Sequence, residues 1–346
     1  MKKNILIAIV FALVLGAFFG WDYFQTYFVS NVPKTLNDEF VLFPSGSTYE
    51  ENVKTLLEKG FVENEQTFRT AAEKMNFKGR NGRFKIKAGW NNKELVQHLR
   101  SGEQSAVKVP FTTERTLENI AAKAGRFLES DSTKIFATLD NEEFIKNLGY
   151  TKETLMSIFI PNTYEVFWNT TPEKFVEKMV KEHDKFWEKD NRKEKAKNIV
   201  CGKGTLTMTP EEVYALASIV EKETNAVAEK PTVAGAYLNR LAIEMKLQAD
   251  PTCVFASKDF LTRRVTQKHL SFDSPYNTYL YKGLPPGPIS IASISSIDAV
   301  LNPQVHQYIY FCAKPDNIGT HSFAETFPQH QVNVDKYIEW LGRRGY

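Results

Sequence analysis

The sequence predicts an α+β protein that is held to a membrane by an N-terminal transmembrane helix. The run from Asn4 to Trp21 is uncharged and almost entirely apolar. Residues 40–103 then alternate strand-like and helix-like patterns, which is typical of a small βααβ module. From Thr209 onward, a well-capped helix precedes a region rich in Pro and Gly. We therefore expect five segments, at residues 1–24, 25–39, 40–103, 104–204 and 205–346.

The N-terminal run has the composition of a membrane anchor. Its 18 residues approach the roughly 20 that cross a bilayer, and Trp21, Tyr23 and Phe24 follow where interfacial aromatic residues gather. Two lysines before the run predict a cytoplasmic N-terminus and an extracytoplasmic body, in the cytoplasmic (inner) membrane. A cleaved signal peptide is the alternative, although Gly16–Phe19 is a poor cleavage site. We expect an uncleaved, single-pass anchor in the lipid bilayer, joined to the body by linker residues 25–39.

Bulk composition excludes several other classes of protein. The 346 residues are 42% hydrophobic and carry a net charge of only +3, without a basic cluster that would predict nucleic-acid binding. Cys201, Cys253 and Cys312 lie far apart, so we expect three buried thiols, with one disulfide as the alternative. The six histidines are scattered, and neither a zinc motif nor a phosphate loop occurs. We expect no metal and no cofactor.

Local patterns place the elements of residues 40–204. Ser47 to Glu50 matches a capping box, and Gly60 ends the helix that follows it. Residues 159–164 read as a loop or edge strand, and residues 172–199 as one long charged helix with Phe175, Met179 and Phe186 as its apolar stripe. The remaining expected elements are strands at 40–43 and 84–87 and helices at 65–75, 92–99, 116–124 and 141–148.

The C-terminal 142 residues contain the most distinctive helix. Thr209 is the expected N-cap, Pro210 occupies the first helical position, and Glu212 completes a capping box. A second helix is expected over 228–243, and residues 248–289 are expected to form a long segment without regular structure. Short helices are expected at 297–301 and 334–341.

Helical periodicity distinguishes two acids at the end of the helix that begins at Thr209. Thr224 falls near the centre of the buried side, Lys222 is expected to face solvent, and Glu221 and Glu223 flank the buried side. Glu223 follows Ile219 at one turn, whereas the flank of Glu221 is more polar. A carboxyl group among apolar neighbours has a raised pKa and is suited to general acid catalysis. The alternative is that both glutamates are surface residues at a helix end.

Three downstream segments combine rigid loops with hydrogen-bonding and aromatic side chains. They are Leu247–Thr252, Ser274–Tyr279 and the Pro-rich Gly283–Ile289. Tyrosine rings stack on sugars, and amides bind sugar hydroxyl and acetamido groups, so these segments suit a polysaccharide groove. Ordinary turn chemistry is the alternative for each segment by itself.

Together these motifs resemble the YceG-like family over nearly the whole chain. The resemblance rests on Ile160–Tyr164, Ala217–Thr224, Asn239–Leu241, Leu247–Thr252, Tyr276–Tyr279, Gly283–Ile289 and His321–Phe323, in this order. It implies a LysM-like peptidoglycan-binding module at 40–103, a middle region at 104–204 and a lysozyme-like, YceG-type catalytic domain at 205–346. Asn162 stands where many members carry Asp, a departure outside the predicted catalytic helix.

The resemblance implies a lytic transglycosylase that cuts glycan strands of peptidoglycan internally. The bond broken would be the β-1,4 linkage between N-acetylmuramic acid and N-acetylglucosamine, and the product would end in 1,6-anhydro-N-acetylmuramic acid. Enzymes of this kind use a glutamate in a Glu-Ser or Glu-Thr pair, which Glu223-Thr224 matches and Glu221-Lys222 does not. Glu223 is therefore the predicted catalytic residue.

The resemblance further implies a set of substrate-binding residues and of partners. The substrate-binding residues are Gln248, Asp250, Thr252, Tyr276, Asn277, Tyr279 and His321. Asp250 is the one candidate for a second catalytic group, although we expect it to fix its loop. Penicillin-binding synthases of the elongation machinery are implied as partners of an enzyme that terminates nascent strands. A non-catalytic peptidoglycan-binding scaffold and a hydrolase that leaves reducing ends are the alternatives.

Overall fold

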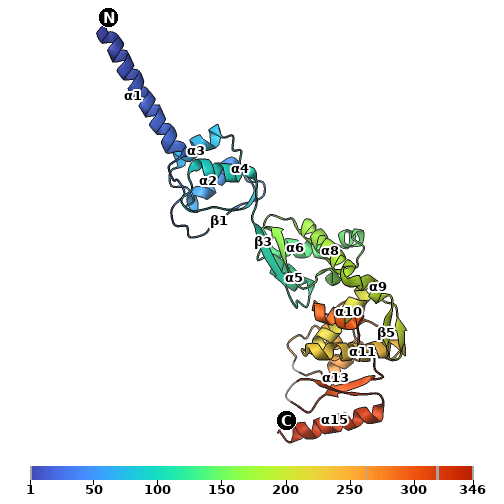
Figure 1. Cartoon of the computed structure of the whole chain (residues 1–346). Helices are drawn as coiled ribbons and strands as arrows, with labels where there is room; N and C mark the ends of the chain where they lie inside the picture. The colour runs from blue at the N-terminus through green and yellow to red at the C-terminus, as the bar shows by residue number, and fades with distance from the viewer. Residues whose placement is uncertain (1, 263, 317–318, 345–346) are drawn as a thin grey trace. The chain divides into compact units, whose positions relative to one another are not determined.

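The computed structural model describes residues 2–262, 264–316 and 319–344 (Figure 1). Within these residues the strands form two-stranded sheets only, namely β1–β2, β3–β4, β5–β6 and β7–β8. The elements are α1 (Lys2–Tyr27), β1 (Phe40–Phe43), α2 (Tyr49–Glu58), α3 (Glu65–Lys74), β2 (Gly82–Lys85), α4 (Asn92–Ser101), β3 (Ala106–Phe111), α5 (Leu117–Ala124), α6 (Ser132–Leu139), α7 (Glu142–Asn147), η1 (Leu155–Ile158), β4 (Asn162–Phe167), α8 (Pro172–Glu188), η2 (Lys189–Asn191), α9 (Arg192–Ala196), β5 (Ile199–Cys201), β6 (Gly204–Leu206), α10 (Pro210–Glu223), η3 (Val227–Glu229), α11 (Lys230–Ala242), α12 (Asp250–Ser257), α13 (Gln267–Leu270), α14 (Ile294–Leu301), β7 (Tyr310–Ala313), β8 (His321–Ala324) and α15 (Phe327–Gly342).

The chain forms two compact units. The first contains the residues up to Lys108, together with 127–130 and 165–170. The second contains Val109–Arg126, 131–164 and the chain from Thr171 onward. The mixed composition of helices and short sheets agrees with the α+β class expected from the sequence.

The first unit has the βααβ order expected for residues 40–103. β1 pairs antiparallel with β2, with Phe40 opposite Lys85, and a core that includes Phe68 lies beneath the sheet. The expected strand at 84–87 lies two residues earlier, at 82–85. The expected capping box was wrong by one residue. Thr48 caps α2, because its Oγ1 accepts from the Glu51 backbone at 3.3 Å and its backbone N–H donates to Glu51 Oε2 at 2.7 Å, while Ser47 Oγ accepts from the Asn52 amide at 2.9 Å.

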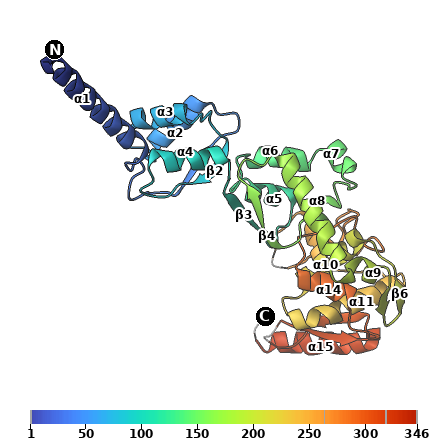
Figure 2. The ribbon, with the colours of Figure 1, turned by 45° about the horizontal axis from the view of Figure 1, so that its top comes forward.

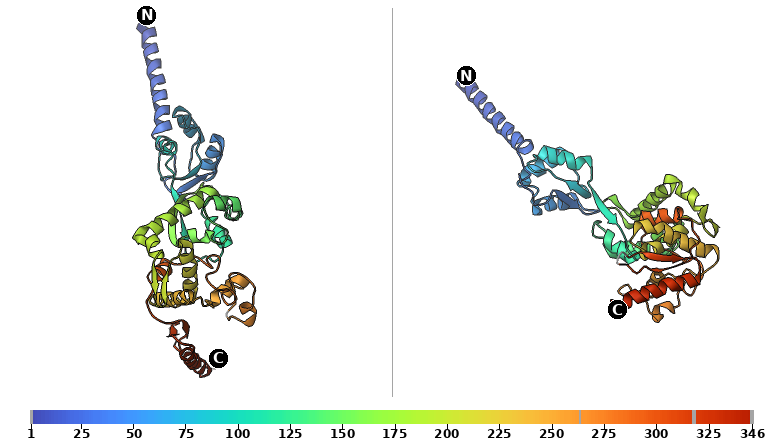
Figure 3. Two further views of the ribbon diagram at one scale, coloured as in Figure 1. Left: turned by 90° about the vertical axis from the view of Figure 1, so that its right-hand side faces the viewer. Right: turned by 60° about the horizontal axis from the view of Figure 1, so that its bottom comes forward.

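The N-terminal helix α1 is long and apolar. Its 26 residues include a window with a mean hydropathy of 2.3, and large apolar side chains such as Phe11 and Phe18 are exposed. Figure 3 shows its N-terminal part standing clear of the βααβ module. By length and composition, α1 is consistent with a single-pass membrane anchor.

The second unit is built around α10. Eight consecutive residues of α10, Val213–Val220, are buried, and α11 and α14 pack against it (Figure 2). The core that they share also takes in Trp187 from α8 and Ile289 from the loop before α14. α10 is thus a central helix, and its C-terminal end emerges from the core with its acidic residues attached.

Two expected elements of the second unit have different bounds. The helix expected over 172–199 ends at Glu188, because Asp190 and Asn191 adopt left-handed φ angles of 57° and 56°, which short polar side chains tolerate. The segment 248–289 is not structureless, since it contains α12 and α13. Pro251 suggested a loop, but it lies in the first turn of α12, where a helix tolerates proline.

Other elements of the second unit lie closer to the bounds expected from the sequence. The helices expected at 116–124, 141–148 and 228–243 occur within a few residues of those bounds, and the segment 159–164 contains the start of β4, which pairs with β3. The last two helices are longer than expected, at Ile294–Leu301 and Phe327–Gly342. All three cysteines are free, but only Cys201 and Cys253 are buried, whereas Cys312 is partly exposed.

Candidate active site

The two ends of α10 are fixed by local contacts, and these contacts determine where the acidic residues of the site lie. Thr209 Oγ1 accepts a hydrogen bond from the Glu212 backbone at 3.2 Å, and Glu212 Oε2 accepts one from the Thr209 backbone at 2.8 Å. This capping box, with Pro210 after it, fixes the first turn as expected. The helix ends at Glu223 because Thr224 is extended, with φ −142°. Thr224 is buried, as periodicity predicted.

Glu223 is a partly buried acid with a single short hydrogen bond. The Tyr237 hydroxyl donates to Glu223 Oε1 at 2.5 Å. Burial raises the pKa of Glu223 to about 7, although the bond from Tyr237 and the charges of His321 and Arg240 act to lower it. The nearby carboxylate of Asp250 adds to the increase. At neutral pH, Glu223 therefore holds its proton for a substantial fraction of the time.

Glu221, two residues earlier, lies in the opposite electrostatic setting. Its Oε2 accepts hydrogen bonds from Lys230 Nζ at 2.7 Å, Ser293 Oγ at 2.5 Å and Ser296 Oγ at 2.6 Å. Burial by itself would raise the pKa of Glu221, but these hydrogen bonds outweigh it and hold the pKa below the usual value. Glu221 is thus an ionised acid whose Oε2 joins α10 to α11 and to the start of α14.

Tyr237 is held in place from behind. It lies on α11, fully buried, and Phe311 of β7 packs edge-on against its ring with centroids 5.4 Å apart. Arg240, one turn later, donates to the Leu247 carbonyl at 2.5 Å and to the Ile309 carbonyl at 2.6 Å. The Tyr237 ring is thus packed in the interior beside Phe311 and Arg240, and its hydroxyl donates to Glu223.

A pocket of about 260 Å³ opens beside Glu223. Its polar lining residues are Glu223, Asp250, Thr262, Arg115 and Lys222, and its apolar lining residues are Pro251, Val254, Phe255, Phe260 and Ile289. The expectation that Lys222 faces solvent was therefore wrong. Lys222 is partly buried in the wall of this pocket.

A second pocket of about 520 Å³ shares Phe255 with the first. Tyr276, Lys152 and Glu153 are among its lining residues, and Tyr276 packs on Phe255 with ring centroids 4.8 Å apart. Phe255 is therefore part of the wall of both the space beside Glu223 and the larger one.

Asp250 and Tyr279 form a pair at the first pocket. The Tyr279 hydroxyl donates to Asp250 Oδ1 at 2.5 Å, and Asp250 is exposed as the first residue of α12. Asp250 is thus both a lining residue of the pocket and a fixed point of its loop. The neighbouring Gln248 has an exposed side chain and a left-handed φ of 47°.

Thr252 and Asn277 have structural contacts in the interior. Thr252 Oγ1 lies 2.8 Å from Thr278 Oγ1, and the Asn277 amide donates to the carbonyls of Leu270 and Phe272 at 3.0 and 2.8 Å. Both side chains are fully buried. They hold the loop that presents Tyr276 and Tyr279.

His321 lies on β8 and is paired with an acid. Its Nδ1 is 2.9 Å from Glu229 Oε2, and its backbone N–H donates to Glu229 Oε1 at 2.7 Å. Its ring also meets Phe311 edge-on, with centroids 5.3 Å apart. Through Phe311, His321 belongs to the layer behind Tyr237, and its charge influences Glu223.

The Pro-rich loop over 283–289 is anchored directly to α10. Ser218 Oγ accepts from the Ile289 backbone at 3.0 Å, and the Tyr214 hydroxyl accepts from the Ala292 backbone at 3.2 Å. Gly287 lies so close to the Glu153 carbonyl that an added Cβ would collide with it. The loop is therefore fixed against both the helix and the wall of the larger pocket.

Three residues at this site were not predicted from the sequence. Periodicity placed Tyr237 in the apolar stripe of its helix, and the signal for its role is that a buried phenol needs a hydrogen-bond partner. Arg115 and Lys222 gave no signal, since they come together only in the fold. Among the residues that the structure describes, His, Cys, Asp and Glu side chains form no group that could hold a metal ion.

Known proteins are similar to this chain in sequence, and one solved structure is similar to it in fold. An endolytic murein transglycosylase of Bacillus subtilis is 31% identical over 85% of this chain and 83% of its own length. One of Streptococcus pneumoniae is 24% identical over 98% of this chain and 66% of its own length. A crystal structure of a yceG-like protein of Listeria monocytogenes superimposes with a TM-score of 0.56 at 26% identity, covering 85% of this chain and 97% of that one.

The family assignment rests on the extent of the match as well as on these relatives. The model of the YceG-like family matches residues 41–336, which includes α10, both pockets and the βααβ module. With this match and a relative above 30% identity over most of both chains, the chain belongs to the YceG-like family.

Proposed function

We propose that this protein is a membrane-anchored lytic transglycosylase that cuts peptidoglycan glycan strands internally and leaves 1,6-anhydro-N-acetylmuramic acid ends. The observation that carries the proposal is Glu223. It is a pocket-lining carboxyl group with a pKa of about 7, next to Thr224 at the end of a buried helix. The names of the B. subtilis and S. pneumoniae relatives support the broader class, an enzyme that acts on peptidoglycan.

In the first step Glu223 acts as a general acid. Its protonated carboxyl group donates to the glycosidic oxygen as the bond from C1 of the muramoyl ring breaks, and positive charge develops at C1. A pKa of about 7 keeps the proton available at neutral pH. The Asp250 carboxylate, at the same pocket, is suited to stabilising the developing positive charge.

In the second step the same residue acts as a base. The Glu223 carboxylate takes the proton from the C6 hydroxyl of the muramoyl ring, and the C6 oxygen bonds to C1 to close the 1,6-anhydro ring. No water is consumed, so no second carboxylate is needed to activate one. The Tyr237 hydroxyl, bonded to Oε1, would fix the carboxyl group so that Oε2 faces the reacting atoms in both steps.

The two pockets would accommodate consecutive sugars of one strand. Phe255 lines both, and its ring with that of Tyr276 offers an apolar surface on which a pyranose can stack. We propose that Gln248, Asp250, Tyr276 and Tyr279 contact the strand. Thr252 and Asn277 would hold the loop, and His321 would act from behind Tyr237.

We further propose roles for the rest of the chain. Residues 40–103 would be a LysM-like module that binds glycan, residues 104–204 a middle region, and residues 205–346 the catalytic domain. α1 would be an uncleaved anchor in the cytoplasmic membrane with its N-terminus inside.

Protease protection tests this orientation. Protease added outside spheroplasts should digest the body of the protein while leaving the first residues protected. If the protein acts next to penicillin-binding synthases, it should crosslink to such a synthase in cells. A strain that lacks the protein should also contain longer glycan strands.

Product masses test the proposed reaction. Glycan strands digested with the full chain should give internal fragments that are 18 Da lighter than hydrolysis products, since the anhydro ring excludes one water. Water-added ends would identify a hydrolase instead. Intact strands that remain bound to the protein would identify a non-catalytic scaffold.

The pH profile should follow the ionisation of Glu223. For a general acid, kcat/KM should be level below a pH of about 7 and fall about tenfold per unit above it. Tyr237→Phe removes a hydrogen bond that lowers the pKa of Glu223, so the alkaline limb should move to higher pH. Tyr214→Phe removes a buried hydroxyl that donates to the Phe159 carbonyl and accepts from the Ala292 backbone, and it should leave the limb in place. A limb unmoved by Tyr237→Phe would contradict the assignment.

A further inference from the structure

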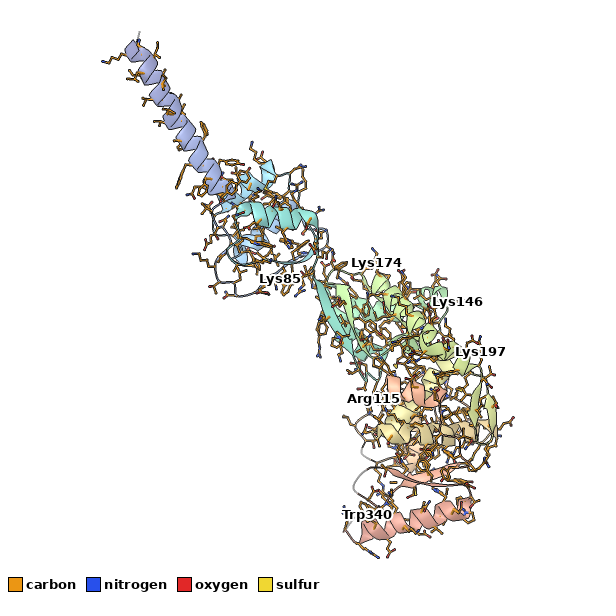
Figure 4. All side chains as sticks on the ribbon, in the orientation of Figure 1. Lys85, Arg115, Lys146, Lys174, Lys197 and Trp340 are labelled. Atoms are coloured by element: carbon orange, nitrogen blue, oxygen red, sulfur yellow. The ribbon has the colours of Figure 1, made fainter. Side chains whose placement is uncertain are left out.

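Two cations lie in the wall of the pocket that contains Glu223. Lys222 comes from the end of α10, and Arg115, which is labelled in Figure 4, comes from the segment before α5. The Arg115 guanidinium also lies over the Phe260 ring, 5.3 Å from its centroid. Both residues face the same space of about 260 Å³ as the predicted acid.

The carboxylates next to these cations in sequence are already paired with other lysines. Glu114 accepts from Lys123 Nζ at 2.6 Å, and Glu221 accepts from Lys230 Nζ at 2.7 Å. Asp250, in the same pocket, accepts from Tyr279. Across the described parts of the chain, neither Arg115 nor Lys222 has a carboxylate within ion-pair distance.

Two positive charges that lie near each other in a partly buried pocket without a carboxylate partner are unfavourable. Burial lowers the pKa of Lys222, and the positive charge of Arg115 lowers it further, while attraction by Glu221 opposes both effects. Such a pair is stabilised when an anion binds between its members, because charge-assisted hydrogen bonds replace the repulsion. The pocket is therefore prepared for a negatively charged group on its ligand.

We infer that Arg115 and Lys222 form an anion subsite beside Glu223 that binds a carboxylate of the muramoyl side chain. The inference rests on the proposed function and specifies its substrate. In an alternating strand, only muramic acid carries a lactyl group, whose carboxyl group is free on a denuded strand and amide-linked on a strand with peptides. In the second case the peptide supplies the carboxylates. Binding this group would place the muramoyl ring, and not the glucosamine ring, with its C1 at Glu223.

The test measures binding without cleavage. The full chain carrying Glu223→Gln is titrated with denuded strands and with peptide-bearing strands, each with its carboxylates either free or converted to amides. Amidation should weaken binding about tenfold for the strand type that supplies the carboxylate, the loss typical of a charge-assisted hydrogen bond. The strand type that shows this loss identifies the source as lactyl or peptide.

Added substitutions locate the subsite. Lys222→Gln and Arg115→Gln should each weaken binding of the carboxylate form about tenfold and leave the amide form unaffected, as a coupled pair does. Lys174→Gln removes the same charge from the exposed face of α8 (Figure 4) and should change neither. Equal binding of the carboxylate and amide forms by the Glu223→Gln protein without these added substitutions would overturn the inference, and this result does not depend on whether the Lys222 or Arg115 variants fold.

The two proposals fail separately. If the carboxylate preference is found but the intact chain leaves strands uncut, the subsite stands and the transglycosylase proposal fails. If anhydro ends form while binding ignores the carboxylate, the reaction stands and the subsite fails.

Discussion

Replacing Glu223 by Gln should lower the rate of strand cleavage by about 10²–10⁴-fold, the usual contribution of general acid–base catalysis. Glutamine has nearly the same shape and its carbonyl oxygen still accepts the Tyr237 hydrogen bond, but it can neither donate the proton nor take it back. Release of anhydro-ended fragments per minute measures the effect. Glu177→Gln, on the exposed face of α8, is the matched control and should retain full activity. An active Glu223→Gln enzyme would disprove the role.

The same variant should be stable, and increasingly so at high pH. The pKa of Glu223 is higher in the folded than in the unfolded state. Its contribution to the free energy of unfolding is therefore fully present below the unfolded pKa. That contribution is lost as the pH rises through about 7, because a partly buried carboxyl group must then ionise. Glu223→Gln and the unsubstituted protein should thus unfold alike near pH 4, and Glu223→Gln should be the more stable near pH 9. Denaturant unfolding at the two pH values checks this.

Glu221→Gln should instead lower the free energy of unfolding by about 3–5 kcal/mol, the typical cost of removing one partner from a buried ion pair. The Lys230 ammonium, with only 5% of its side chain exposed, would keep its charge without a counter-ion. The combined change Glu221→Leu with Lys230→Met should recover much of the loss, since it removes both charges. Urea unfolding of the three proteins measures the difference.

The dependence on pH gives a second check on Glu221. The pKa of Glu221 is lower in the folded protein than in the unfolded chain. Its contribution to the free energy of unfolding is therefore present above the pKa of the unfolded state, and it is lost as the pH falls through the pKa of the folded state. The difference between Glu221→Gln and the unsubstituted protein should therefore shrink in acid. If Glu221→Gln were fully stable and yet inactive, the two glutamates would have to exchange roles.

The different surroundings of the two glutamates were predictable, because they depend on local periodicity. Counting about 100° per residue placed Glu223 beside Ile219 and Glu221 on a polar flank, and the serines of α14 occupy that flank in the fold. The same count misplaced Lys222. A helical wheel gives the direction of a side chain but not what lies opposite, and Arg115 arrives there from more than 100 residues earlier.

Elements with strong local signals were also predictable, and those without were not. The βααβ order was recognisable because its two helices have their own capping residues, Thr48 for α2 and Asn64 for α3. The hairpins β5–β6 and β7–β8 were not expected. β5 and β6 have three residues each, and the four-residue strands β7 and β8 lack the polar–apolar alternation of residues 84–87. Tyr237 could be placed in the core, but its bond to Glu223 depends on how α11 crosses α10.

The burial of α10 on nearly every side has a consequence for how this protein can vary. Glu221 and Glu223 are two positions apart, about 200° of helical rotation, so one acid contacts lysine and serine while the other lines the pocket. Inserting or deleting a single residue between Thr209 and Glu221 would rotate both acids by about 100° relative to the capped start. It would bring the wrong side chain to each environment. Single substitutions within α10 can have small or large effects, whereas any change in the number of residues between its start and the two acids moves both of them. Homologous chains should therefore align through this helix without a gap.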